Sequence, residues 1–154
     1  MAERAANNRE GLQGYVTHQP FKGLRIPATS QNLIMRDYVR GKGKVFRLSR
    51  GEYFFDGCFL QLYAMLRDLD QIEGIVMCSL FMLPDRADKR REIFDQLLAA
   101  GGSMHFIYET LVVEDEEGVR QAEELLLLNA ALERSPRMID PALLPPIGGV
   151  DSFT

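Results

Sequence analysis

The sequence has little cysteine and no tryptophan, and it contains no long apolar run. Its two cysteines, Cys58 and Cys78, are fewer than a disulfide-stabilised secreted domain carries, and neither lies in a metal-binding spacing. No apolar stretch approaches the ~18 residues of a membrane span. Residues 1–10 lack the apolar segment of a signal peptide. These absences predict a cytoplasmic protein with reduced thiols, no metal and no membrane partner.

The chain also lacks an excess of positive charge. It has 22 acidic and 18 basic residues among 154, for a net charge of −4. The basic run of Lys89, Arg90 and Arg91 is short and lies among acidic residues, which is typical of a solvated helix face. This balance gives no general attraction to phosphate backbones, so we expect no nucleic-acid partner.

Motifs that announce a cofactor or a nucleophile are absent as well. The sequence has no Gly-x-Gly-x-x-Gly fingerprint and no phosphate-binding loop that ends in Gly-Lys-Ser/Thr. It has no Gly-x-Ser-x-Gly nucleophile elbow. We therefore expect no cofactor.

What the sequence does contain is a regular alternation of strand and helix signals. Apolar patterns and breakers predict strands at residues 12–17, 44–49, 74–83 and 104–108. They predict helices at residues 31–40, 58–69, 88–100 and 114–133, with Thr29 or Ser30 capping the first helix. The alternation predicts an α/β fold with a mostly parallel, four-stranded open sheet and helices on both faces, in a resolvase-like or flavodoxin-like three-layer architecture.

The length and composition favour a single domain. Residues 1–10 are small, polar and charged, so we expect them to be disordered. Residues 11–135 hold the strand and helix signals and form the α/β domain. Residues 136–154 form a tail rich in proline and glycine, which we expect to be extended. The 46% apolar content is sufficient for one core.

Polar side chains follow the predicted strands, where ligands bind in open parallel sheets. Each of them could instead be an ordinary surface, capping or core residue, and only their convergence favours a site. The candidates from the strand ends and from the first loop and helix are Thr17, Arg25, Gln31, Arg36, Glu52, Tyr53, Ser79 and Glu109. His105 begins the fourth strand, about 13 Å from Glu109 at about 3.3 Å per residue, so we expect it to be a structural histidine.

The layout resembles the catalytic domain of serine recombinases, or resolvases. The similarity is carried by residues 14–16, 31–33, 75–76 and 97–110, followed by a long leucine-rich helix. That family places its nucleophilic serine after the first strand, where this chain has Thr17 and His18. Its arginines after the third strand are replaced by residues 79–84. The resemblance therefore implies the fold without the DNA-cleaving chemistry.

A closer resemblance is to a small bacterial family, the sporadic carbohydrate cluster proteins. The residues that carry it are Gly14, Tyr15, Val16, Thr17, Pro20, Phe21, Gly23, Arg25, Pro27, Gln31, Asn32, Leu33, Arg36, Asp37, Tyr38, Glu52, Tyr53, residues 74–76 and 79–84, His105, Phe106 and Glu109. Gln19 and residues 28–30 depart from that pattern. The resemblance implies a role in gene clusters for capsule or lipopolysaccharide sugars, and it leaves the reaction open.

Two hypotheses follow for the function. In the first, the protein is a cofactor-independent isomerase or lyase that acts on a sugar or activated sugar. Arg25 and Arg36 would then bind an anionic group, with Thr17 and Gln31 also in the binding site. Glu109 or Glu52 would be the base and Tyr53 or Ser79 the hydrogen-bonding partner. In the second, it is a non-catalytic, resolvase-like binding subunit.

The four consecutive leucines at residues 125–128 predict an oligomer. Four successive helical positions spread around about 300° of a helix. Only one face of the helix can pack on the protein's own sheet, so at least one leucine must point elsewhere. We therefore expect a homodimer that pairs through the helix at residues 114–133. The alternative is that residues 136–150 fold back over the extra leucines.

Overall fold

The computed structural model describes residues 9–134. Its centre is a five-stranded sheet, in which β1 (Leu12–Val16) is an inner strand. The other strands are β2 (Phe46–Gly51), β3 (Gly74–Met77), β4 (Ser103–Phe106) and β5 (Leu111–Val113). They lie in the order β2-β1-β3-β4-β5, and all neighbours are parallel except β4 and β5. The predicted α/β class with a mostly parallel open sheet is confirmed.

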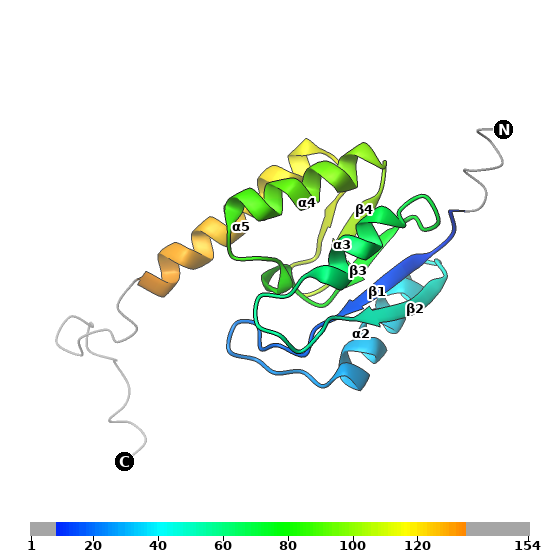
Figure 1. The fold of residues 1–154 in the computed structure, drawn as a ribbon, viewed down its shortest axis with the longest axis horizontal. Coiled ribbons are helices and arrows are strands. Elements are labelled where there is room, and N and C mark those ends of the chain that lie inside the picture. The colour runs from blue at the N-terminus through cyan, green and yellow to red at the C-terminus, as the bar shows by residue number, and fades with distance from the viewer. Residues whose placement is uncertain (1–8, 135–154) are drawn as a thin grey trace, which may run out of the picture.

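Three α-helices and one short 3₁₀ helix connect these strands, and a fourth α-helix follows the last strand. They are α2 (Ala28–Gly41), α3 (Leu60–Arg67), η1 (Leu80–Met82), α4 (Ala87–Ala99) and α5 (Glu116–Arg134). From β1 the chain moves to β2 at one edge of the sheet, and from β2 it moves in the opposite direction, past β1, to β3 and then β4. Because crossover connections are right-handed, α2 covers one face and α3 and α4 cover the opposite face. The α5 helix packs on β5 and η1 and extends past the sheet (Figure 1).

The fifth strand was not predicted from the sequence. After β4 the chain makes a tight turn in which Thr110 has a φ of 51°. It then returns as β5, which pairs antiparallel with β4. A strand of three residues is too short to show the alternating pattern by which strands are recognised. The predicted four-stranded sheet therefore gains an antiparallel edge.

Two predicted boundaries were also wrong. The apolar run at residues 74–83 is not one strand, because β3 ends at Met77 and the Ser79 side chain accepts a hydrogen bond from the Phe81 amide at 3.2 Å, which starts η1. The α2 helix begins at Ala28, and neither Thr29 nor Ser30 caps it. Its first hydrogen bond runs instead from the Gln31 amide to the Pro27 carbonyl at 3.0 Å.

Gly14 lets three elements meet over the middle of β1. A Cβ atom at this position would lie 2.9 Å from both Met35 Cε on α2 and Ser49 Cβ on β2. These distances are too short for any side chain, so glycine permits the close packing. Every residue of β3 is buried, as expected for a strand covered on both faces. Because β1, β2, β3 and β4 run parallel, their carboxyl ends lie along one rim of the sheet.

The predictions for residues 1–8 and 136–154 lie outside the described part of the chain. Among the helices within residues 9–134, none combines the length and the apolar character needed to cross a membrane.

Candidate functional site

Two neighbouring cavities open at the carboxyl rim of the sheet. Cavity A has a volume of about 700 Å³, and cavity B has a volume of about 400 Å³. Cavity A is lined by Tyr15, Thr17, Gln19, Pro20, Phe21, residues 57–60, Tyr63 and residues 81–86 and 89. Cavity B is lined by Phe21, Lys22, Leu24, Ser79, Phe81, Tyr108, Glu109, Leu125, Leu128, Asn129 and Leu132. Phe21 and Phe81 line both, so these two rings form the wall between the cavities.

Gln31 fixes the loop that borders cavity A. Its side chain is completely buried, and its amide nitrogen donates to the carbonyls of Thr17 at 2.7 Å and Ile26 at 2.8 Å. Its amide oxygen accepts from the Thr17 backbone at 3.2 Å. These bonds satisfy backbone groups that the loop would otherwise bury without partners. Gln31 thus shapes the cavity from behind and does not line it.

Glu52 lies beneath cavity A in a dense set of donors. It is 4% exposed, and its carboxylate accepts from the Tyr15 hydroxyl at 3.0 Å. The backbone amide of Gln61 donates to it at 3.0 Å and that of Leu62 at 3.3 Å. These amides belong to the first turn of α3, where a carboxylate satisfies unpaired donors and the helix dipole. Glu52 therefore caps α3 and holds the floor of the cavity.

The floor of cavity A carries two more groups from the same cluster. The Cys58 thiol donates to Glu52 Oε2 at 3.7 Å, and both Cys58 and Tyr15 line the cavity. Burial, reinforced by the neighbouring Glu52 carboxylate, raises the pKa of Tyr15 far above its usual value. Tyr15 consequently remains a protonated phenol and acts as a hydrogen-bond donor.

Glu109 occupies the corresponding position beside cavity B. It lies in the turn after β4 and accepts from the Ser79 hydroxyl at 3.1 Å and from the Leu80 amide at the start of η1. Burial raises the pKa of Glu109, and these two bonds and the charge of Lys22 only partly oppose the shift. Glu109 is thus a half-buried carboxylate with fewer donors than Glu52.

The predicted site residues do not share one pocket. Thr17 lines cavity A, whereas Ser79 and Glu109 line cavity B. Tyr53 is exposed, and its hydroxyl accepts from the Gln61 side chain at 3.1 Å. Arg25 is exposed on the loop before α2. The prediction of a single pocket was wrong because Phe21 and Phe81 occupy the middle of the rim.

Arg36 lies away from the rim, on the side of α2 that faces the edge strand β2. Its guanidinium carbon lies 6.0 Å from the centre of the Phe46 ring on β2. It lines a separate hollow of about 440 Å³ together with Arg40, Lys44, Phe46 and Leu48. The α2 helix begins near the rim at Ala28 and runs back along the sheet, so Arg36 lies roughly 12 Å from its start at about 1.5 Å per residue. The predicted role of Arg36 in an anion site at the rim was therefore wrong.

Several residues that line cavity A were not predicted from the sequence. Tyr15 lies inside a strand, where an aromatic side chain is typical of the hydrophobic core. Cys58 resembled an ordinary reduced thiol. Lys89 and Arg86 lie at the start of α4, and the fold brings them to the cavity from a part of the chain distant from Tyr15 and Cys58. Their only sequence signal was a helix start that follows a buried strand.

His105 is held in the interior near the other end of the sheet. Its Nδ1 shares a hydrogen bond with the Tyr38 hydroxyl at 2.8 Å, and its Nε2 shares one with the Ser103 hydroxyl at 3.1 Å. Burial, with smaller contributions from Lys42 and Lys44, lowers the pKa of His105 to about 4. Neutral imidazole satisfies both bonds, in agreement with a structural role. Within residues 9–134, no cluster of three or more His, Cys, Asp or Glu side chains could hold a metal ion.

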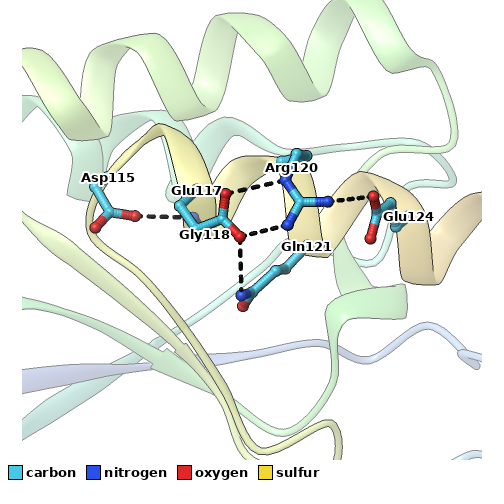
Figure 2. Close-up of polar contacts among 6 residues, drawn as sticks. All are labelled: Asp115, Glu117, Gly118, Arg120, Gln121 and Glu124. Atoms are coloured by element: carbon cyan, nitrogen blue, oxygen red, sulfur yellow. Dashed lines mark hydrogen bonds and ion pairs between the residues drawn. The ribbon is translucent and has the colours of Figure 1, made fainter.

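The outer surface of α5 is polar in its first half and apolar toward its C-terminal end. Asp115 accepts from the Gly118 amide at 2.8 Å and so caps the helix, and Arg120 pairs with Glu117 and with Glu124, each about one turn away (Figure 2). Further along the helix, Leu127 is 73% exposed and Leu128 is 57% exposed. The polar half is thus paired within the helix, whereas the leucines lack cover from residues 9–134.

Comparison with known proteins gives a fold and no family. No protein-family model matches the chain, and no curated protein sequence matches it. Among solved structures, the chain is similar to the N-terminal catalytic domain of TP901-1 integrase, with a TM-score of 0.52 and 13% sequence identity. The similarity covers 80% of this chain and 96% of that domain. The resolvase-like, three-layer architecture is therefore confirmed at the level of the fold.

Proposed function

We propose that the protein acts on a phosphorylated or nucleotide-linked sugar of bacterial surface-polysaccharide synthesis, and that cavity A binds this ligand. The observation that supports the proposal is the composition of cavity A. It combines hydroxyl groups from Thr17, Tyr15 and Tyr63 with apolar rings and with cationic side chains at its mouth. Sugar rings offer C–H faces to aromatic side chains and hydroxyls to polar ones, and cavities of ~300–1,000 Å³ suit small ligands.

The anionic part of such a ligand has a natural place at the start of α4. Arg86 is the N-cap residue of this helix, and Lys89 follows in its first turn. Both line cavity A. The helix dipole and these cations together favour a phosphate group. Arg86 pairs with Asp88 at 2.7 Å, and Lys89 lies only 3.8 Å from Glu92, so these exposed contacts can exchange for a ligand.

Proton transfer in cavity A would fall to Cys58, with Glu52 as a positioning residue. The thiol faces the cavity and hydrogen-bonds to a buried carboxylate. A thiolate at this position could remove a proton beside a carbonyl group, as an isomerase or lyase requires. The Thr17 hydroxyl, which accepts from the Gln19 amide and lines the cavity, could then donate its hydrogen to the developing oxyanion. Glu52 was predicted from the sequence as a catalytic base, and in this proposal it only positions Cys58.

The test is a thermal-shift screen of the purified chain against sugar phosphates, nucleotide sugars and keto-sugar acids. A ligand at 100 times its dissociation constant should stabilise the protein by about 2.7 kcal/mol. Lys89→Ala should weaken binding, whereas Arg120→Gln on the outer side of α5 should not. Cys58→Ser should retain binding and lose turnover. Failure of every compound class to raise the melting temperature would refute the proposal.

A second candidate is a non-catalytic binding subunit, favoured by the exposed leucines of α5. We propose that two copies pair through this helix, because each extra leucine that becomes buried contributes about 1.5–3 kcal/mol. Light scattering should then give twice the 17.5 kDa of one chain, and Leu127→Glu or Leu128→Glu should return the monomer. Leu126 packs against the core, so its replacement would disturb the fold as well. Glu124→Gln is the matched control, and a wild-type mass of one chain would end the dimer proposal.

A further inference from the structure

The fold assembles a basic surface from cations that are scattered along the sequence. Residues 36–50 contain six lysines or arginines and a single acidic residue, Asp37. No run of adjacent cations marks this segment, because the charges are spread over the end of α2, the following turn and β2. In the structure, Arg36, Arg40, Lys44, Phe46 and Leu48 line one hollow of about 440 Å³, named here the basic hollow. The surface is independent of cavity A.

The positive charge of the basic hollow is largely uncompensated. Among residues 9–134, neither Arg36 nor Arg40 forms an ion pair, and Lys44 pairs with Glu73 at 2.9 Å in an exposed contact. The hollow on the other side of β2 differs, because it contains Asp68 and Asp70, and Asp68 pairs with Arg50 at 2.5 Å. Anion attraction is therefore concentrated on the α2 side of the sheet edge.

Exposed aliphatic side chains accompany these cations. Leu48 is 87% exposed at the rim of the basic hollow, and Val45 just before β2 is 48% exposed. Leu33 is also exposed, and it precedes Arg36 by three residues and Arg40 by seven on α2. Positions with this spacing lie on one stripe of a helix. The surface thus presents leucine and arginine side by side.

The edge strand itself is unsuited to pairing with another strand. The register between β1 and β2 shifts between Gln13 and Tyr15, which places a bulge in β2 at Leu48 and Ser49. Bulges and cationic side chains are the features by which edge strands avoid strand addition. A partner must therefore be recognised through the side chains of this surface.

We propose that the basic hollow and its aliphatic rim form a docking surface for an anionic lipid bilayer. Cations near a bilayer gain energy from acidic headgroups, and adjacent exposed leucines enter the boundary between headgroups and acyl chains. A nucleic acid would use the arginines but would leave Leu48 without an apolar partner. The expectation of no membrane partner came from the absence of a spanning segment, and peripheral docking needs none.

Vesicle flotation of the full chain tests this proposal. The protein should bind vesicles of phosphatidylcholine mixed with phosphatidylglycerol, should not bind phosphatidylcholine alone, and should dissociate at high salt. Replacing Arg36 and Arg40 by glutamine together should weaken binding about thirtyfold, at about fivefold per cation. Leu48→Ser should weaken it about tenfold while the salt dependence remains. Arg120→Gln removes a cation from α5 and should leave binding unchanged.

Three outcomes would overturn the proposal. The first is no binding to the anionic vesicles. The second is binding that neither the Arg36 and Arg40 pair nor Leu48→Ser weakens. The third is equal or tighter binding to a DNA duplex that depends on the two arginines and not on Leu48, which would assign the surface to nucleic acid. Circular dichroism of each variant confirms that the exposed replacements leave the fold intact.

Discussion

Glu52 and Glu109 are two carboxylates in equivalent places that the structure treats differently. Each follows a parallel strand at the carboxyl rim, and each accepts a backbone amide at the start of the next helical segment. Glu52 is buried, accepts from Tyr15 and Cys58 and caps the eight-residue helix α3. Glu109 is half-buried and caps only the three-residue η1. The difference teaches that the donors around a carboxylate, more than its place in the sheet, decide whether it supports structure or is available for chemistry.

The largest expected difference in unfolding free energy is between two single variants, in which glutamine replaces either Glu52 or Glu109. Glu52→Gln puts amide hydrogens against the donors of Gln61, Leu62 and Tyr15 and should cost about 4 kcal/mol of unfolding free energy. Glu109→Gln disturbs fewer bonds and should cost about 1 kcal/mol. Urea unfolding of both variants measures the difference. Equal losses would show that the two carboxylates are equivalent after all.

The next effect concerns His105, whose pKa shifts in the direction opposite to that of Glu109. The folded protein lowers the pKa of His105 from 6.5 to about 4, so the unfolded chain binds more protons between these values. Stability is therefore present above pH 6.5 and is lost as the pH falls toward 4, by about 3 kcal/mol at 1.36 kcal/mol per unit. Unfolding free energies of wild type and His105→Gln across this range should diverge by that amount.

If the two pH profiles in that experiment are parallel, then the pKa of His105 is the same in the folded and unfolded chain, and its role as a buried neutral imidazole is wrong. Tyr38→Phe is a useful companion, because it removes the hydroxyl that is hydrogen-bonded to Nδ1 and leaves the titrating ring. It should lower stability at every pH and retain the slope of the wild type.

The smallest effect isolates Glu109. Its pKa in the folded protein is raised above the usual 4.5, so here the folded state binds more protons than the unfolded state. The sign is opposite to that of His105: the contribution is complete below pH 4.5 and is lost as the pH rises through the raised pKa. In a His105→Gln background, unfolding free energy should fall over this range. Adding Glu109→Gln should remove that fall, whereas adding Gln121→Ala on α5 should leave it.

The fold was largely predictable because its signals are local. Alternating apolar runs and breakers predicted all four parallel strands and the four helices around them. The complete burial of β3 followed from an unbroken apolar run bounded by glycine. β5 escaped notice because three residues carry no period, and the end of β3 was misplaced because Ser79 turns the chain within an apolar stretch. Boundaries depend on single side-chain bonds that a pattern does not reveal.

The site was less predictable because it depends on side chains that meet from distant parts of the chain. The sequence by itself determined a parallel sheet whose carboxyl rim carries Thr17, Glu52, Ser79 and Glu109. Only the tertiary structure decided that Phe21 and Phe81 divide this rim into two cavities. It also gathered scattered cations of α2 and β2 into one hollow. Strand and helix periods are set by neighbouring residues, whereas a cavity is set by which side chains fill the space between elements, and that is decided only when they pack.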